Sequence, residues 1–409
     1  MESYDLELNA IDKIINGKGF INLVINNTLR TTKLDESRAS LFTKIVYGVV
    51  ENKIYLDYQL SFYLKNDKIA QDIKTILRMG CYMIYFLNLA NYHIIDSLVE
   101  LTKEKYSNYT KMVNAILRNF TRNELKEIPQ DDLKKYYSIK YSYPIALVGF
   151  LMKQYPNDIE SILKPSTDIY NTYRVNTIKI KEADLLKQFN FEYELIDSAI
   201  ITKTNLSKKD YFKKNYLVYQ DYASQMVSIV MDPKKNDKIL DMCSAPGSKS
   251  FHMASMLNNE CSITSCDIYE HKTKLIEDEA KRLGVTCIKT ITCDSALYDF
   301  QEEYDCVLLD APCSGLGVMK HKCDLKYHIT FKDIEDIIVL QKSLLGKACK
   351  VVKTGGKLVY STCTINKEEN EEMIKYFLKK HKEFEVVKTI SFLPTDKHDG
   401  FFICKMIKK

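Results

Sequence analysis

Two cysteines, Cys313 and Cys363, each follow a short apolar run that is typical of a buried strand. The first run, residues 306–309, leads into Asp310 and then Cys313, and the second, residues 356–362, leads directly into Cys363. Ligands of open α/β sheets bind beyond the carboxyl ends of the strands. We therefore expect two thiols and a carboxylate to form a reactive site at one edge of a sheet. For either cysteine alone, a place in the core is an equally good explanation, because free cysteine is often buried.

The composition is that of a soluble chain with two or three domains. It has 409 residues, of which 45% are hydrophobic and 28% charged, and a net charge of +5 that gives weak support for a nucleic-acid partner. No apolar run approaches the ~18 residues of a spanning helix, and no secretory signal opens the sequence. The twelve cysteines include no Cys-x-x-Cys pair and no zinc-finger spacing. We therefore expect a cytoplasmic protein with free thiols, no membrane partner and no metal site.

Residues 1–130 predict an all-helical domain, because apolar residues recur there with helical spacing and no proline precedes Pro129. Four helices are expected, over residues 37–62, 73–84, 94–106 and 113–120. Three basic residues either contact RNA or lie on a solvated face: Arg78, Lys111 and Arg118.

Residues 131–219 predict a small α+β module that links the two larger domains. A strand is expected over residues 174–180, followed by a helix over 181–189 and a further strand. Lysines and aromatic residues alternate near its end: Lys203, Lys208, Lys209, Tyr211, Phe212, Lys213, Lys214 and Tyr216. Such a segment suits an RNA backbone with unstacked bases, and an exposed lysine-rich loop is an equally good explanation.

Residues 220–409 alternate between strand and helix patterns, which predicts a doubly wound α/β domain. The strands are expected over residues 238–242, 262–267, 287–292, 304–309, 356–362 and 400–406. One helix runs from Lys272 to a left-handed cap at Gly284, and a helix of about twenty residues runs up to Val352. A capping box of Asn366 and Glu369 is expected to open another helix.

A loop of small residues joins the first of these strands to a helix, where backbone N–H groups can approach a ligand. The loop lacks the glycines of the Walker A motif and of the dinucleotide fingerprint. Asp267 lies twenty residues after Gly247 at a strand tip, which suits a carboxylate that binds two ribose hydroxyls. Asp294 can accept from an adenine amino group. A nucleoside held without phosphate-binding groups indicates S-adenosylmethionine, and its expected binding residues are Cys243, Ser244, Ala245, Pro246, Gly247, Ser248, Lys249, Asp267, Asp294 and Asp310.

Three motifs together resemble the RNA cytosine-5 methyltransferases: Asp-Met-Cys-Ser-Ala-Pro-Gly-Ser-Lys, Asp-Ala-Pro-Cys-Ser-Gly and Ser-Thr-Cys. Segments 76–82 and 113–118 resemble a NusB-type helical domain, and Arg174-Val-Asn, Gln220-Asp-Tyr-Ala-Ser and Asp399-Gly-Phe-Phe also match. The whole chain is similar to the Sun/RsmB branch. Two positions depart from its pattern, because Ser248 replaces a glycine of the cofactor loop and Cys323 stands where proline is common.

The resemblance implies methyl transfer to cytosine C5 of 16S rRNA, in which Cys363 adds to C6 and Cys313 assists its later release. Lys249 would increase the thiolate fraction of a nearby cysteine. Asp310 would hydrogen-bond either the N3 edge of the cytosine or the amino group of the cofactor. We expect a monomer, because all of these residues lie in one chain, and we expect residues 1–130 to select the RNA.

Three other readings remain open at this point. The same reaction can act on tRNA or 23S rRNA. The chain can be a NusB-like RNA-binding accessory protein with an inactive α/β domain, although the residues for the chemistry are present. Finally, Cys313 and Cys363 can form a redox pair, which no other feature of the sequence supports.

Overall fold

The computed structural model describes residues 3–17, 19–64, 69–87 and 89–409, and it contains two compact units. The first unit runs to Pro165 and also takes in the later segment His321–Ile329. The second unit consists of Ser166–Lys320 and Thr330–Lys409. Within these described ranges, every helix is too short or too polar to cross a lipid bilayer.

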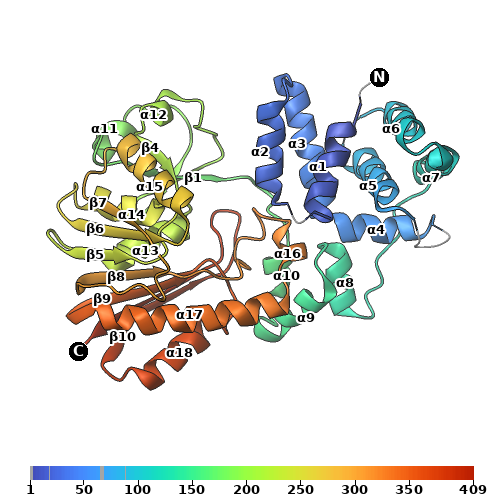
Figure 1. Ribbon diagram of the computed structural model, residues 1–409. Coiled ribbons are helices and arrows are strands. Elements are labelled where there is room, and N and C mark those ends of the chain that lie inside the picture. Colours follow the sequence, from blue (N-terminus) through green and yellow to red (C-terminus); the bar gives the residue numbers. More distant parts are fainter. Residues whose placement is uncertain (1–2, 18, 65–68, 88) are drawn as a thin grey trace. The chain divides into compact units, whose positions relative to one another are not determined.

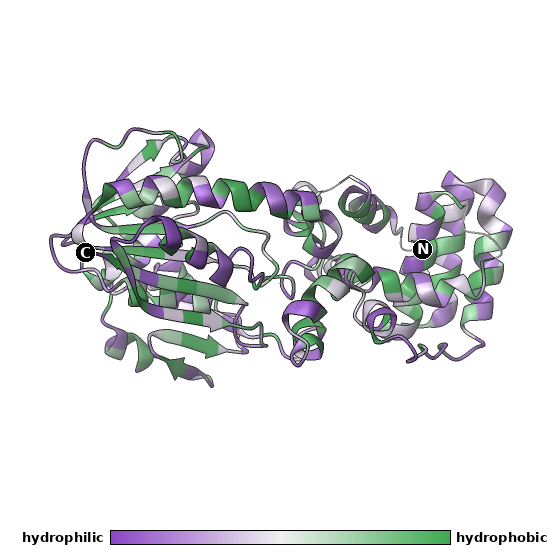
Figure 2. Ribbon diagram, turned by 90° about the horizontal axis from the view of Figure 1, so that it is seen from below, coloured by the Kyte–Doolittle hydropathy of each residue, from purple (hydrophilic) through white to green (hydrophobic). Residues whose placement is uncertain are grey.

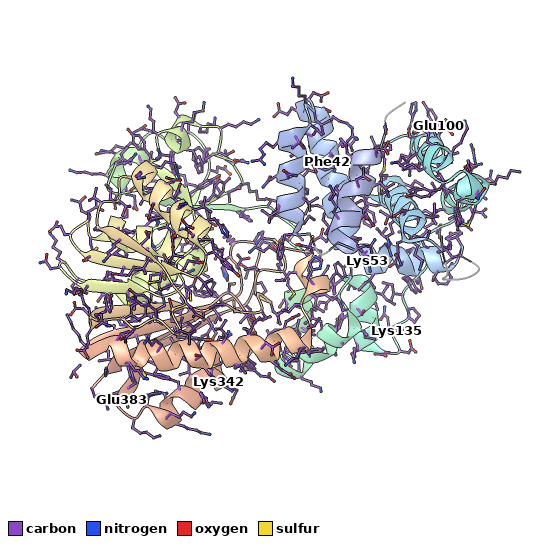
Figure 3. All side chains as sticks on the ribbon, in the orientation of Figure 1. Phe42, Lys53, Glu100, Lys135, Lys342 and Glu383 are labelled. Carbon is purple, nitrogen blue, oxygen red and sulfur yellow. The ribbon has the colours of Figure 1, made fainter. Side chains whose placement is uncertain are left out.

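The first unit is helical, as the sequence predicts (Figure 1). Its helices before Pro129 are α1 Asp5–Ile15, α2 Ile21–Thr31, α3 Glu36–Glu51, α4 Lys53–Ser61, α5 Gln71–Phe86, α6 Asn91–Lys105, the 3-10 turn η1 Ser107–Tyr109 and α7 Thr110–Phe120. Three more follow: α8 Leu133–Lys140, α9 Ile145–Gln154 and α10 Ile159–Leu163. The prediction of a single helix over residues 37–62 is wrong, because the helix is interrupted at Asn52, between α3 and α4. Phe42, labelled in Figure 3, is fully buried on α3.

Arg78 is neither exposed nor positioned to contact RNA, which corrects both readings of that residue. Its side chain is buried within α5, and its Nε and Nη2 groups donate to the Asp57 carboxylate at 2.7 and 2.9 Å. Lys111 and Arg118 are exposed on α7, so both readings remain open for them. Helix α5 is buried on all sides here, because every residue from Thr75 to Met83 is buried.

The segment His321–Ile329 packs among the helices of the first unit and forms the short helix α16, Leu325–His328. The buried Asp324 carboxylate accepts the Ile21 N–H at 3.0 Å, where it caps the first turn of α2. Lys326 donates to the Glu51 carbonyl at 2.9 Å. The Lys53 ammonium, labelled in Figure 3, lies 5.3 Å from the centre of the Tyr327 ring. Hydrophobic periodicity gives no sign of this distant partnership.

The second unit begins with a small antiparallel sheet of order β2-β3-β1-β4. Its strands are β1 Asn171–Val175, β2 Glu194–Ile196, β3 Ala199–Thr202 and β4 Leu217–Tyr219, with helices α11 Glu182–Leu186 and α12 Asp210–Lys213. The strand expected over residues 174–180 is therefore displaced toward the N-terminus. The chain leaves the sheet at Asn176, and the next residue, Thr177, donates to the Ser255 carbonyl at 2.8 Å.

The large sheet has the order β10-β11-β9-β8-β5-β6-β7 and confirms the α/β prediction. Its strands are β5 Lys238–Asp241, β6 Ser262–Asp267, β7 Ile288–Thr292, β8 Tyr304–Asp310, β9 Val352–Thr362, β10 Phe384–Phe392 and β11 Phe401–Lys408. The pairs from β9 to β7 are parallel, whereas β11 pairs antiparallel with β9 and β10. The sequence did not indicate β10. The middle of β8 is fully buried, because residues 306–309 have no exposed surface.

Helices cover both faces of the large sheet and bury two separate cores (Figure 1). One face packs against α17 Phe331–Val351 and α18 Glu371–Lys380, and the other against α13 Tyr222–Met231, α14 Ser248–Met256 and α15 Glu270–Leu283. The strands are mostly green in Figure 2, whereas the surrounding helices carry hydrophilic stretches. The capping box expected at Asn366 and Glu369 is wrong, because α18 begins at Glu371 and the Glu369 side chain has other partners.

Candidate active site

The two cysteines that follow β8 and β9 lie side by side. Their Sγ atoms are 3.3 Å apart, which is hydrogen-bond distance for two sulfurs. The two strands are parallel, and Asp310 pairs in register with Ser361, so both strands end at the same edge of the sheet. Both cysteines are partly buried. The structure thus brings together the two thiols that the sequence singled out.

A charged pair lies beside the thiols. The Lys249 ammonium, at the start of α14, donates to Asp310 Oδ2 at 2.5 Å, and Asp310 Oδ1 accepts from the Ser361 hydroxyl at 2.7 Å. Burial opposes the charge of Lys249, but Asp310 and then Cys363 raise the pKa of this lysine above its ordinary value. Lys249 is therefore a permanent cation whose field acts on Cys363.

The two thiols have different electrostatic surroundings. The hydrogen bond with Cys363, burial and the nearby Glu369 carboxylate all raise the pKa of Cys313 well above its ordinary value. Cys313 therefore keeps its proton, and its S–H can donate to Cys363 Sγ. A thiolate at Cys363 would be stabilised by this donor and by the Lys249 cation. The geometry favours one nucleophilic sulfur and one protonated neighbour.

Glu369 holds the loop that carries Cys313 by hydrogen bonds, and the sequence analysis did not identify it as a site residue. Glu369 has no exposed surface. Its carboxylate accepts from the Ser314 N–H at 2.8 Å and from the Ser314 hydroxyl. It also accepts from Gln341 Nε2 at 3.1 Å and from Asn366 Nδ2 at 3.0 Å. These bonds fix the backbone next to Cys313, and local sequence patterns do not reveal the contact because Glu369 lies 55 positions after Ser314.

A close backbone approach fixes the position of the Cys363 loop. The Gly317 N–H donates to the Cys363 carbonyl at 3.1 Å, and the Gly400 N–H donates to the Gly317 carbonyl at 2.9 Å. A Cβ atom on Gly317 would overlap the Gly400 carbonyl oxygen. Any larger residue at position 317 must push the strand ends apart, so this glycine holds both cysteine loops in register.

A cavity of about 330 Å³ opens beside β5, and its lining includes the two carboxylates that were predicted to bind the ribose and the adenine of the cofactor. Cys243, Asp267 and Asp294 line it, together with Ile268 and Leu340 as apolar walls. The Asp267 carboxylate is buried, accepts the Tyr269 N–H at 3.1 Å and lies 3.7 Å from the Lys272 ammonium. Two carboxylates between apolar walls, without a phosphate cradle, fit a nucleoside such as that of S-adenosylmethionine.

The other predicted cofactor residues lie outside that lining. The loop residues turn beneath the cavity, where the Ser244 N–H donates to the Cys266 carbonyl at 2.8 Å and Gly247 adopts a φ of +98°. Ala245, Pro246, Gly247 and Ser248 lead into α14, which begins at Ser248, and Lys249 with Asp310 lies beside the cysteines. The serine that replaces the usual glycine therefore starts the helix.

A buried carboxylate, Asp241, was not identified from the sequence. It ends β5 and accepts from the Ser250 hydroxyl at 2.7 Å. Burial, with a contribution from Asp310, raises the pKa of Asp241 to about 6. Its position at a strand end matches that of Asp310, and this strand-end criterion would have found it. Asp241 ties the start of α14 to the sheet and so positions Lys249.

Comparison with known proteins agrees with this geometry. The model of the 16S rRNA methyltransferase RsmB/F family matches residues 228–407, and that of the NusB family matches residues 3–122. A probable ribosomal RNA small subunit methyltransferase B of Bacillus subtilis is 32% identical, over 99% of this chain and 98% of the relative. Its counterpart in Escherichia coli K12 is 25% identical over 92% of both chains. Among solved structures, a methyltransferase homologue from Pyrococcus horikoshii is 26% identical with a TM-score of 0.59, covering 67% of this chain and 98% of its own.

Proposed function

Because the chain belongs to the RsmB/F family of 16S rRNA methyltransferases, we propose that it methylates C5 of a cytosine through a covalent cysteine adduct. It is an S-adenosylmethionine-dependent methyltransferase of small-subunit rRNA with a helical NusB-like region. The cytosine-5 chemistry is supported chiefly by one observation, the two thiols 3.3 Å apart beside a lysine–aspartate pair. Since rRNA is the substrate, we place the enzyme in the cytoplasm.

Asp267 and Asp294 would hold the nucleoside of S-adenosylmethionine, and Ile268 and Leu340 would pack against its base. When bound, this cofactor supplies an electrophilic methyl group. The carbon that must accept the methyl group, C5 of cytosine, is a poor nucleophile in the aromatic ring. The protein therefore has to activate the base.

Cys363 is the residue that we propose for this activation. Its Sγ adds to C6 of the base, the C5–C6 double bond opens, and C5 becomes the nucleophilic carbon of an enamine. Lys249 favours the thiolate form of Cys363 before addition. Asp310 lies at the same strand end, and in its protonated form it would donate to N3 of the base, which withdraws electrons from C6.

Cys313 is proposed to act after methyl transfer. The proton on C5 must leave and the bond between Cys363 Sγ and C6 must break, which restores the double bond. Once Cys313 has released its own proton to solvent, its sulfur, 3.3 Å from the nucleophile, can accept the C5 proton as Cys363 Sγ leaves as a thiolate, while Glu369 and Ser314 hold the loop. Two thiols thus serve two separate steps, addition and elimination.

The RNA must present an unstacked base, because C6 is unreachable within a helix. Lys208, Lys209 and Lys214 surround a surface pocket of about 390 Å³ together with Tyr211 and Tyr216. We propose that this pocket holds RNA near the target and that the NusB-like helices select the 16S molecule. One chain provides all of these groups, in keeping with a monomeric enzyme.

The test uses wild-type protein, Cys363→Ala and Cys313→Ala with labelled S-adenosylmethionine and unmodified 16S rRNA. We expect Cys363→Ala to be inactive, and Cys313→Ala to accumulate a protein–RNA adduct that survives denaturing gels. Bisulfite sequencing of the wild-type product locates 5-methylcytosine. If the trapped adduct appears with Cys363→Ala instead, the two roles are reversed. Labelling of tRNA or 23S rRNA in preference to 16S rRNA would overturn the substrate assignment alone.

A further inference from the structure

A large cavity lies away from the cysteines, between the small sheet and helices of the second unit. It measures about 600 Å³. Strand β1 contributes Arg174, α14 contributes His252 and Met256, and the turn between β2 and β3 contributes Ser198. The cofactor loop precedes α14, whereas this cavity lies at the other end of the same helix.

Arg174 is a buried cation without a counter-charge. The residue is 2% exposed, its Nε donates to Gln220 Oε1 at 2.8 Å and its Nη1 donates to the Val175 carbonyl at 3.3 Å. Among the described residues, no carboxylate lies within ion-pair distance of it and no acceptor pairs with its Nη2 group. Burial alone lowers the pKa of this guanidinium to about 9. A buried charge costs free energy unless a partner offsets it, so an acceptor from outside the chain would stabilise it.

Two further polar atoms in the same cavity are buried without partners among the described residues. They are Nδ1 of His252 and the hydroxyl of Ser198, and His252 as a whole residue is only 4% exposed. Burial and then the charge of Arg174 lower the pKa of His252 well below its ordinary value, so the imidazole is neutral. Native structures leave few buried polar groups unpaired. Two such atoms beside the guanidinium of Arg174 indicate a polar ligand that this chain does not supply.

The rest of the lining narrows the chemistry of that ligand. Glu182 and Asp197 line the cavity on the side of the small module, and Asp197 is exposed at its rim. These carboxylates would repel a phosphate. Val175, Ile229 and Met256 are apolar and can cover the faces of a flat ring. The ligand therefore needs acceptors for Arg174, donors for the carboxylates and an apolar plane.

We propose that this cavity receives a guanine base of the RNA substrate. Guanine offers two adjacent acceptors, O6 and N7, which a guanidinium such as that of Arg174 binds as a pair. Its N1–H and N2 amino groups are donors that Glu182 or Asp197 can accept. Adenine carries an amino donor at the position of O6 and would oppose Arg174.

The test measures binding of fluorescein-labelled RNA pentamers by anisotropy. The probes are UUGUU, UUAUU, and the same sequence with 7-deazaguanine or inosine at the centre. We expect wild-type protein to bind the guanine probe about tenfold more tightly than the adenine probe. Loss of N7 or of the N2 amino group should each weaken binding. Equal affinity for the guanine and adenine probes would overturn the proposal.

Two variants locate the preference, and one exposed lysine serves as the control. Arg174→Met should abolish the discrimination between guanine and adenine, Glu182→Gln should reduce the preference for guanine over inosine, and Lys187→Met should leave both unchanged. Thermal unfolding and S-adenosylmethionine binding check that each variant is folded. Glu182 is only half-buried, so its variant remains informative if Arg174→Met does not fold. Discrimination that persists in both variants would place the guanine elsewhere and overturn the proposal.

The inference rests on RNA as the substrate, but it does not rest on the cysteine chemistry. The binding assay contains no cofactor and can be repeated with Cys363→Ala. A wild-type protein that methylates rRNA but shows no guanine preference defeats only this proposal. A protein that prefers guanine but forms no cysteine adduct defeats only the proposed mechanism.

Discussion

Two cysteine pairs lie on neighbouring strands of the large sheet, at opposite edges. Cys313 and Cys363 follow the carboxyl ends of β8 and β9, with their Sγ atoms 3.3 Å apart. Cys261 and Cys287 precede the amino ends of β6 and β7, with their Sγ atoms 3.6 Å apart. All four side chains are partly buried. Proximity of two sulfurs therefore does not distinguish a reactive pair from an inert one.

The surroundings of the two pairs differ in charge. Lys249 lies near Cys363, and Glu369 fixes the loop of Cys313. At the other edge, the hydrogen bond with Cys287, burial and the nearby Asp237 carboxylate raise the pKa of Cys261, while the hydrogen bond with Cys261 lowers the pKa of Cys287. A thiolate is stabilised by a cation and disfavoured by a carboxylate. The distinguishing feature that we propose is the Lys249 cation at the carboxyl edge, and the predictions below test whether it makes that pair the reactive one.

The largest contrast should come from removing one sulfur of each pair. Cys363→Ser should lower the methylation rate by at least about a thousandfold, as for other enzymes that lose a nucleophile. Cys287→Ser is the matched control and should leave the rate unchanged. Transfer of labelled methyl groups to 16S rRNA measures both. Comparable losses in the two variants would mean that the pairs act together, which contradicts the comparison.

The second contrast concerns charge, and the sheet provides its own control. Lys249 pairs with Asp310 at the carboxyl end of β8, and Lys353 pairs with Asp305 at 2.6 Å near the amino end. Lys249→Met should lower the rate about a hundredfold at neutral pH, because a removed cation no longer favours the thiolate.

The pH dependence sharpens this test. A thiolate without its cation forms only at higher pH, so the rate–pH profile of Lys249→Met should move toward alkaline pH and part of the lost activity should return there. Lys353→Met should keep the wild-type profile. An equal loss at every pH would mean that Lys249 acts on the fold or on the substrate, rather than on the sulfur.

Glu369→Gln should have a smaller effect, because it alters the support of Cys313 and not the nucleophile. A glutamine keeps the size but replaces one acceptor oxygen with an NH₂ group that faces donors. We expect a loss of about 1.5–3 kcal/mol in the free energy of unfolding, which is the range for hydrogen bonds to charged groups. Urea denaturation measures it. Glu368→Gln, at the exposed neighbouring position, should be neutral, and equal stabilities of the two variants would count against the role of Glu369.

The smallest effect is expected at the far pair. The double variant Cys261→Ser, Cys287→Ser should methylate rRNA at the wild-type rate. Its free energy of unfolding should lie within about 1 kcal/mol of the wild-type value, since both side chains are only partly buried. Methyl transfer and urea denaturation are both needed. A marked loss of methylation with intact stability would show that this edge of the sheet also contributes to catalysis.

Local patterns in the sequence were sufficient for much of the fold and for the placement of the thiols. Strand periodicity and strand ends predicted that Cys313 and Cys363 meet, because parallel strands end at one edge. The patterns failed where a partner is distant. Asn366 and Glu369 have the spacing of a capping box, but Glu369 satisfies Ser314 instead. A buried arginine likewise gives no sign of its partner, as Arg78 and Asp57 illustrate.

The segment His321–Ile329 makes the chain enter the helical unit a second time. Lys326 donates to the Glu51 carbonyl and Asp324 accepts the Ile21 N–H. The chain after the Cys313 loop is therefore held by residues that lie some 270 to 300 positions earlier in the sequence. A protease cut after Pro165 should therefore yield two fragments that elute together. Deletion of residues 1–130 would leave this segment without its partners, so a loss of activity in that variant would not by itself show that the helices bind RNA.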